Sequence, residues 1–433
     1  MFKRILASVF VLMLVLTFVP VAATQETVDC GTDQPVSINF ITGSVGGEYE
    51  ATAAVVSRYA EVCPNVTVGL VARPTSTTDT LGQYQMFFSA QSNLIDVYML
   101  DVFYPAILAE HLVDLTPYVD QAFLDQFYPT LIQAATVDGR LLALQWFASA
   151  PVLFYRTDLL AKYGYDAPPT TWAELTEMAQ TIQDGERATN PDFWGFVWQG
   201  NAYEGLTCDA LEWQASFGGG VIITPDGVIQ VNNPETIAAF EMAAGWVGTI
   251  TPEGVLSFQE EDARAVWQAG NAAFMRNWPY AYPLGQADDS PIKDLFSVVP
   301  LPGLEAGMSA ATLGGWQLGV SRYSANVDAA VAFVKWMVSY DQLKTYDMLR
   351  GELPVMPALY EDPEFLAALP YMANMGDALN FATPRPAVAG AQYAQVSQLY
   401  YTAVHSILAG EADAATAMED LELALADLGF ELP

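Results

Sequence analysis

Basic side chains are scarce in this sequence. Lysine and arginine number 16 among 433 residues, against 50 aspartate and glutamate residues, and the formal net charge is −34. A surface of this charge repels phosphate groups, so nucleic acid and anionic membranes are disfavoured as partners. A small neutral or cationic ligand suits the negative field. The alternative is that the acidic surface serves only solubility.

Histidine and the usual catalytic motifs are almost absent. His111 and His405 are the two histidines, and no Cys-x-x-Cys or His-Glu-x-x-His spacing occurs, so we predict neither a metal site nor a cofactor. The Gly-x-Ser-x-Gly motif is missing, and Ser309 is interpreted as a turn residue. The glycines within 43–47 lack the spacing of a nucleotide-binding loop, which favours close backbone approach at a turn over a phosphate cradle.

Cysteine is also rare, with three in the chain. Cys30 precedes the apolar segment 36–42, and Cys63 precedes the apolar segment 66–71. If these segments are parallel neighbouring strands, both sulfur atoms lie at the same end of a sheet. We therefore predict a Cys30–Cys63 disulfide, which an exported chain permits. Cys208 is interpreted as a small buried residue of a helix rather than a ligand or nucleophile.

Long apolar segments are missing after the N-terminus. Lys3 and Arg4 precede an apolar run over 5–16, and small residues follow at 21–23, which is the pattern of an export signal. We predict a signal peptide over 1–23 and a protein that works outside the cytoplasm, in a periplasm or at the cell surface. Retention as an anchor is the alternative, although the run is shorter than the roughly 18 apolar residues of a membrane helix.

The remaining chain, about 410 residues, exceeds what one hydrophobic core usually organises, which predicts two domains. Strand-like and helix-like segments alternate in its N-terminal third, which predicts a parallel sheet covered by helices. The expected order is strand 36–42, helix 49–62, strand 66–71, helix 83–90 and strand 95–100. Ligands of such sheets bind beyond the carboxyl ends of the strands. Glu48 and Asp101 stand there, after the first and third strands.

Local signals predict further elements. Thr171 and Glu174 form a capping-box pattern that begins a helix, and Pro234 after Asn233 begins another. Turn residues at 224–227 predict a hairpin. No linker of low complexity is visible. Because no linker separates the two predicted domains, we expect the chain to pass between them more than once.

Large aromatic residues stand at predicted turns. Trp278 and Tyr280 follow a strand-like segment, and Pro279 between them prevents a preceding helix from continuing. The segment 314–316, a glycine pair followed by Trp316, is expected to break the chain before the strand-like segment 318–320 and to present the Trp316 ring beside bare backbone. Aromatic rings pack on the C–H faces of sugars, so these rings predict a sugar site. Core packing is the alternative for each ring alone.

Charged residues supply the second half of such a site. Arg385 lies between two prolines on a stiffened loop, where its guanidinium can donate to two oxygens. Glu48 and Asp101 can accept hydrogen bonds from sugar hydroxyls, or they can act as the paired carboxylates of a glycosidase. The acidic residues 260–262 are interpreted as stabilising a helix N-terminus.

Five runs in the chain are long and specific. They are WGFVWQG at 194–200, YEGLTCD at 203–209, GNAAF at 270–274, RNWPYA at 276–281 and ATLGGW at 311–316. With these runs, nearly the whole mature chain resembles the extracellular solute-binding proteins of the maltose-binding class, and most closely the trehalose/maltose-binding branch.

The resemblance implies two α/β lobes joined by a multi-strand hinge, with the ligand in the cleft between them. We expect one lobe over 30–144 and 317–352 and the other over 145–316 and 353–433. It also implies a monomeric, non-enzymatic receptor that docks on the permease of an ABC importer. The ligand contacts that it implies are Glu48, Asp101, Trp278, Tyr280, Gly315, Trp316 and Arg385.

The sequence also departs from the family pattern. The disaccharide binders of this class typically carry an arginine where Thr80 stands, an aspartate where Ser149 stands and often a tyrosine at Phe147. Each lost charge removes hydrogen bonds worth roughly 1.5 to 3 kcal/mol. A smaller or less hydroxylated glycoside, or a differently linked disaccharide, is therefore expected.

The sequence thus predicts a sugar receptor that closes over its ligand and passes it to an importer. Two alternatives stay open. One is a secreted glycoside hydrolase that uses Glu48 and Asp101. The other is a receptor for a non-sugar solute, an osmolyte or a peptide, whose carboxylate would meet Arg385.

Overall fold

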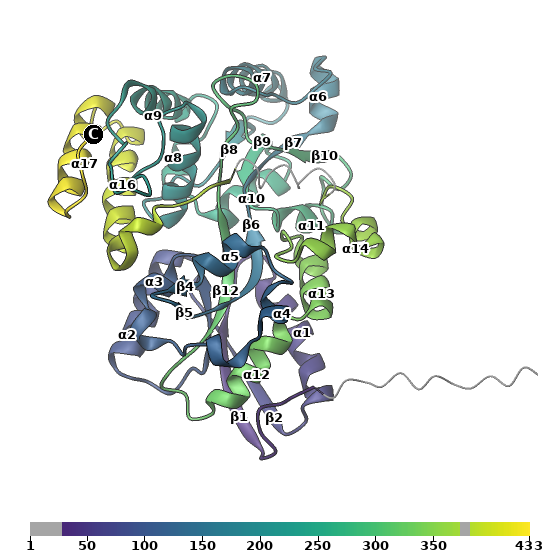
Figure 1. Cartoon of the computed structure of the whole chain (residues 1–433). Helices are drawn as coiled ribbons and strands as arrows, with labels where there is room; N and C mark the ends of the chain where they lie inside the picture. The colour runs from purple at the N-terminus through teal and green to yellow at the C-terminus, as the bar shows by residue number, and fades with distance from the viewer. Residues whose placement is uncertain (1–27, 373–381) are drawn as a thin grey trace, which may run out of the picture.

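The computed structural model describes residues 28–372 and 382–433, so the predicted signal peptide lies outside the described residues. The chain is a mixed α/β protein with a five-stranded sheet in one half and a four-stranded sheet in the other (Figure 1). We call the half with the five-stranded sheet the first lobe and the half with the four-stranded sheet the second lobe. The α/β class and the two-lobed architecture predicted from the sequence are confirmed.

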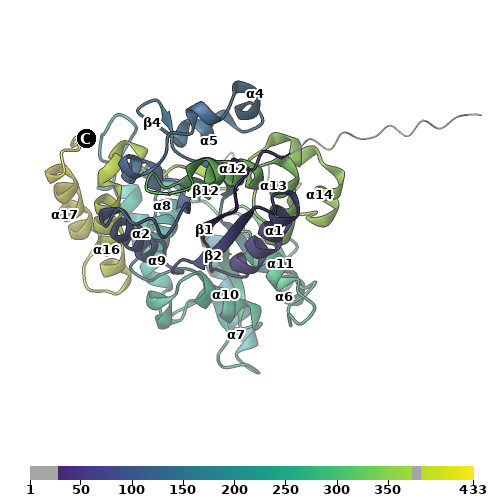
Figure 2. The same cartoon turned by 90° about the horizontal axis from the view of Figure 1, so that it is seen from below.

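Three parallel strands organise the first lobe. β1 (Val36–Thr42) lies between β2 (Val66–Ala72) and β3 (Val97–Asp101) and is parallel to both. The helices α1 (Glu48–Val62) and α2 (Thr77–Ser89) connect them, so the predicted alternation is confirmed. Seen from below, α1 and α2 flank β1 and β2 (Figure 2).

Two strands from distant parts of the chain complete this sheet. β12 (Gly314–Val320) is antiparallel to β3, and β6 (Leu144–Ser149) is antiparallel to β12. The expected break over 314–316 is wrong, because these residues begin β12, which only shifts its register against β6 after Trp316. Gly315 has a φ of +127°, and a Cβ there would lie 2.5 Å from the carbonyl oxygen of Phe147. Glycine therefore allows the two strands to approach.

The second lobe is built on β7 (Val152–Arg156), β8 (Trp194–Val197), β9 (Ala272–Asn277) and β10 (Phe296–Val299). β7 pairs antiparallel with β9 and β10, while β8 is parallel to β9. The capping box at Thr171 forms as predicted.

The remaining elements follow. In the first lobe, the helices are α3 (Tyr104–Ile107), α4 (Gln121–Leu124), α5 (Pro129–Ala134), α12 (Val327–Met337) and α13 (Tyr340–Arg350). The helix α14 (Pro363–Ala368) belongs to the segment that follows α13. In the second lobe, they are α6 (Thr157–Tyr163), α7 (Trp172–Glu186), α8 (Glu204–Ser216), α9 (Pro234–Trp246), α10 (Glu260–Gln268), α11 (Ala281–Gly285), α16 (Tyr393–Leu408) and α17 (Ala414–Asp427). Two short strand pairs are β4 (Thr136–Val137) with β5 (Arg140–Leu141), and β11 (Ala311–Thr312) with β13 (Ala382–Thr383). Short 3-10 helices cover Ala109–His111, Thr116–Tyr118, Glu253–Ser257, Pro357–Glu361 and Ala387–Gln392.

The chain passes between the lobes along β6, along β12 and through the segment after α13. The last of these is fixed to β6, because Ala148 and Leu353 exchange two backbone hydrogen bonds of 3.0 Å. The expected domain boundaries at 144/145 and 316/317 fall at the start of β6 and inside β12. The division of the chain at these residues stays a prediction.

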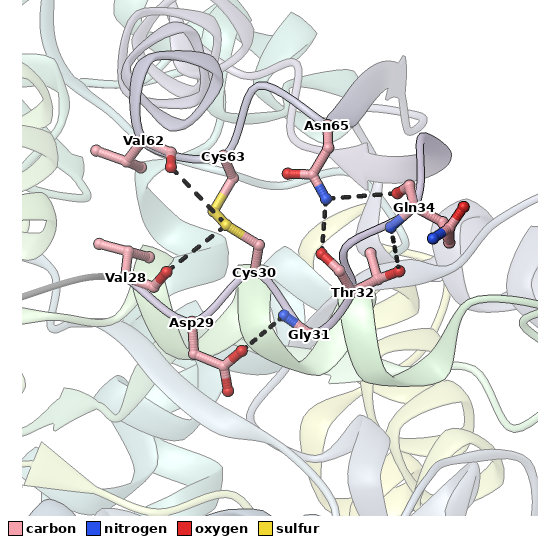
Figure 3. The surroundings of a disulfide bond; sticks show 9 residues. All are labelled: Val28, Asp29, Cys30, Gly31, Thr32, Gln34, Val62, Cys63 and Asn65. Atoms are coloured by element: carbon pink, nitrogen blue, oxygen red, sulfur yellow. Dashed lines mark hydrogen bonds between the residues drawn. A yellow bond between two sulfur atoms is a disulfide. The ribbon is translucent and has the colours of Figure 1, made fainter.

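The N-terminal end of the described chain is tied to the first lobe by a disulfide. Cys30 and Cys63, the pair predicted from the sequence, are joined with their Cα atoms 5.7 Å apart. Asn65 Nδ2 donates to the Thr32 carbonyl at 2.6 Å, and Asp29 accepts from the Gly31 N–H (Figure 3). The parallel pairing of β1 with β2 brings the two cysteines to one end of the sheet.

Each lobe is held by apolar packing. The larger core cluster fills the first lobe and continues through Trp267 and Phe296 under the second sheet, while the other surrounds Trp198, Trp213 and Trp246. Among the described residues, no helix combines the length and the hydrophobicity of a membrane-spanning segment.

Candidate functional site

A cavity of about 80 Å³ lies between the two lobes. Part of its lining comes from the carboxyl ends of strands and the N-termini of helices, where parallel α/β sheets present their ligand sites. The start of β12 and the end of α13 complete it. The carboxylates that line it are Glu48, Asp101, Glu204, Glu260 and Glu352. The cations are Arg73, Arg350 and Arg385, and the aromatic rings are Phe147, Trp278, Tyr280 and Trp316.

A buried ion pair forms one wall of the cavity in the first lobe. Glu48 is the first residue of α1 and is 2% exposed. Arg73, directly after β2, places Nη2 3.2 Å from Glu48 Oε2, and its guanidinium lies 3.9 Å from the centre of the Trp316 ring. Gly43 leaves room for this pair, since a Cβ there would lie 1.5 Å from Glu48 Oε2. The glycine turn thus serves close approach, as predicted.

A second ion cluster crosses from one lobe to the other. Arg385 Nη2 donates to Asp101 Oδ1 at 2.6 Å, and Nη1 donates to Glu204 Oε1 at 2.8 Å. Asp101 ends β3 in the first lobe, whereas Glu204 begins α8 in the second. Burial raises the pKa of both carboxyls, and the charge of Arg385 opposes that rise. The guanidinium lies 4.6 Å from the centre of the Phe103 ring.

A buried ion network in the second lobe packs against Trp278. Arg276 on β9 donates from Nε to Glu212 at 2.9 Å and pairs with Asp209 at 3.2 Å, and all three side chains are buried. The Arg276 guanidinium lies 4.7 Å from the centre of the Trp278 ring. This network fixes the ring at the end of β9. Glu260, at the start of α10, accepts from the Tyr203 hydroxyl at 2.8 Å.

Polar residues also gather where the chain passes between the lobes. Ser149 Oγ donates to Glu352 Oε2 at 3.1 Å, and Arg350 Nη2 lies 3.5 Å from Glu352 Oε1. Burial raises the pKa of Glu352 to about 7, against the lowering effect of Arg350. Arg350 donates to the Gly46 carbonyl and lies 4.9 Å from the centre of the Tyr280 ring.

The structure brings most of the sequence-predicted site together. Residues of that set that line the cavity are Glu48, Asp101, Phe147, Ser149, Trp278, Tyr280, Gly315, Trp316 and Arg385. Thr80 is not among the lining residues. It is buried in the first turn of α2, where its hydroxyl donates to the Ser76 carbonyl at 2.9 Å.

Sequence analysis missed several charged residues of the cavity. Arg73 carries the same signal as Asp101, because both stand at the end of a parallel strand. Glu260 was assigned only to a helix N-terminus, which it does begin, although it lines the cavity as well. Arg350 and Glu352 carry no local signal, because the fold alone brings the end of α13 to the cavity.

The arrangement offers hydrogen-bonding capacity in both directions. Among the described residues, the Nε atoms of Arg73, Arg350 and Arg385 are buried without a hydrogen-bond partner. The carboxylates accept, and the guanidinium groups donate. Within residues 28–372 and 382–433, no group of three histidine, cysteine or acidic side chains could hold a metal ion.

Comparison with known proteins places the chain in a family. Residues 43–344 match the sequence profile of the bacterial extracellular solute-binding proteins. A "Probable ABC transporter-binding protein" of Deinococcus radiodurans is 44% identical over 392 residues, which are 90% of this chain and 93% of that protein.

Solved structures agree with this placement. Maltose-bound MalE3 of T. maritima is 39% identical and superposes with a TM-score of 0.86, covering 90% of this chain and 99% of that one. The GacH receptor of Streptomyces glaucescens GLA.O, at 23% identity, has the same fold, with a TM-score of 0.80 over 90% of this chain and 98% of its own. The resemblance found in the sequence is thus confirmed: the chain belongs to the bacterial extracellular solute-binding proteins.

Proposed function

We propose that this protein is a receptor that binds a small neutral sugar between its lobes and delivers it to an ABC import permease. The observation that carries the proposal is the cavity itself, which is lined by carboxylates and guanidinium groups together with Trp278 and Trp316. Sugar hydroxyls both donate and accept, so they match such a lining, while the indole faces suit the C–H patches of a sugar ring.

The charge of the cavity favours a neutral ligand. Five carboxylates face three guanidinium groups, so an added anion would be repelled. The MalE3 structure contains maltose, which supports a sugar of similar size, a disaccharide or glycoside. The Deinococcus relative is named as a probable ABC transporter-binding protein, which supports delivery of the ligand to an ABC permease. We infer a monomer, since one chain supplies both walls of the cavity.

The two alternatives have less support. A glycosidase acid must be free to donate a proton, whereas Glu48 and Asp101 each pair with an arginine. A non-sugar solute with a carboxylate would need Arg385, but Asp101 and Glu204 already occupy its two Nη atoms.

Titration calorimetry against maltose, trehalose, glucose, a sugar acid and a short peptide tests the proposal. We expect one or more neutral sugars to bind and the sugar acid and peptide not to bind. Chromatography of the incubated sugar should recover it intact. Binding of the peptide alone would favour the non-sugar receptor, and release of monosaccharides would favour the hydrolase.

A further inference from the structure

We propose that Glu352 is a ligand-binding residue, whose carboxylate accepts a hydrogen bond from a sugar hydroxyl at the hinge end of the cavity. This inference rests on the proposed function and assigns one part of its site. Glu352 lies two residues after α13, outside every element that the sequence placed at the site. It is 3% exposed and lines the cavity.

The partners of Glu352 leave its carboxylate room to accept. Ser149 Oγ donates to one oxygen at 3.1 Å, and Arg350 approaches the other only to 3.5 Å. An ionised carboxylate has about four acceptor positions, so at least two remain. Glu204, by contrast, already accepts from Arg385, Tyr393 and Ser397.

The backbone holds Glu352 where a ligand can use it. Leu353 and Ala148 exchange two hydrogen bonds of 3.0 Å, which fixes the neighbouring backbone against β6. Ser149 is the next residue of β6, and its small side chain leaves space beside the carboxylate. A binding group on ordered backbone is oriented before the ligand arrives, which reduces the entropic cost of binding.

The surroundings of Glu352 determine the pH range in which its carboxyl group ionises. The titratable and charged groups that act on it or feel its charge are Arg350, Asp347 and Tyr346 of α13, Glu48 of α1 and Tyr371 after α14. Burial raises its pKa to about 7, so the carboxylate forms between pH 6 and pH 8. Because the ionised form is the stronger acceptor, affinity for the sugar should rise over this range.

Glu352→Gln tests the inference, with Glu361→Gln as the control. Glu361 is an exposed carboxylate of the same segment that does not line the cavity. Each variant is titrated with maltose, or with the tightest sugar of the panel, at pH 6 and pH 8. We expect Glu352→Gln to weaken binding about 5- to 15-fold at pH 8, by loss of a charged acceptor, and to bind nearly as wild type at pH 6. The control should keep the wild-type affinity at both pH values.

The outcomes separate this inference from the proposed function. If wild type binds no sugar, both fail. If wild type binds and Glu352→Gln shows the same affinity and the same pH profile, this inference alone is overturned. Should that variant not fold, Glu352→Asp serves instead, because it keeps the charge but withdraws the carboxylate from the ligand. Weaker binding with a retained pH dependence supports the inference, and unchanged affinity overturns it.

Discussion

At the scale of single residues, the cavity wall concentrates buried charge, and buried charge links stability to pH. Glu352 has a folded-state pKa of about 7, against an ordinary value of 4.5. Between these two values the folded state binds more protons than the unfolded state, so the free energy of unfolding falls as pH rises from about 4.5 through 7. Above pH 7 the free energy of unfolding has lost the whole of this contribution, about 3 kcal/mol.

Glu352→Gln should therefore stabilise the protein at high pH. Glutamine cannot ionise, so the variant avoids the cost of a buried carboxylate. Guanidinium unfolding curves at pH 4 and pH 8 give the test. We expect the variant to gain about 3 kcal/mol over wild type at pH 8 and almost nothing at pH 4. An equal difference at both pH values would show that Glu352 is not the titrating group.

Residue types alone predicted several of the residues that line the cavity. Glu48 and Asp101 were predicted because they follow the first strand and the third strand of a predicted parallel sheet, and Trp278 and Trp316 because large rings stand beside glycine or proline. Arg350 and Glu352 could not be found this way, because their place depends on how α13 packs on the first lobe. Arg73 was missed although its position carried the same signal as that of Asp101.

At the scale of elements, the disulfide joins the segment before β1 to the residue that follows α1. Cys30 and Cys63 close a loop of 33 residues, and cross-linking a loop of that length restricts the unfolded chain by about 3 to 4 kcal/mol. Cys63 is fully buried in the first core cluster. The bond therefore stabilises the lobe in which α1 carries Glu48 and β3 carries Asp101.

Replacing both cysteines by serine should lower the free energy of unfolding by about 2 to 4 kcal/mol. Urea unfolding curves of the double variant and of wild type, with and without reductant, provide the measurement. The free energy of unfolding of wild type in reductant should approach that of the double variant. Cys208→Ser serves as the control for the loss of a thiol, and its stability should not respond to reductant differently from that of wild type. Equal stability of the double variant and wild type would contradict the stabilising role of the bond.

The starts of helices were predicted correctly where a capping residue determines them. The capping box of Thr171 and the Asn233 cap before Pro234 begin α7 and α9 as predicted. The prediction for β12 was wrong, because the glycine pair at its start was taken to indicate a break in the chain. Pairing of the two glycines with Ser149 and Ala148 of β6 outweighs the low strand propensity of glycine, and Gly315 is needed there to let β6 approach.

At the scale of the whole molecule, the cavity is small for its proposed ligand. Its volume of about 80 Å³ lies below the roughly 300 to 1,000 Å³ of typical small-molecule sites. The lobes are held together across it by Arg385, by the Glu204 N–H that donates to Thr78 Oγ1 at 3.2 Å, and by the Phe103 and Tyr393 rings, 4.2 Å apart. Entry of a sugar therefore requires the lobes to separate.

Solution scattering tests whether these contacts hold the lobes together. Arg385→Ala removes the ion cluster that spans Asp101 and Glu204, so without sugar this variant should be more open than wild type and should have a larger radius of gyration. Equal radii of gyration for the two proteins without sugar would contradict the role of this cluster.

The most direct test of the account is a crystal structure of the protein with the tightest-binding sugar of the panel. The account predicts an intact sugar in the cavity, with a ring against Trp278 or Trp316 and hydroxyls donating to Glu48, Asp101 and Glu352. A sugar bound elsewhere on the surface, or a cavity that stays closed to every sugar at saturating concentration, would contradict it.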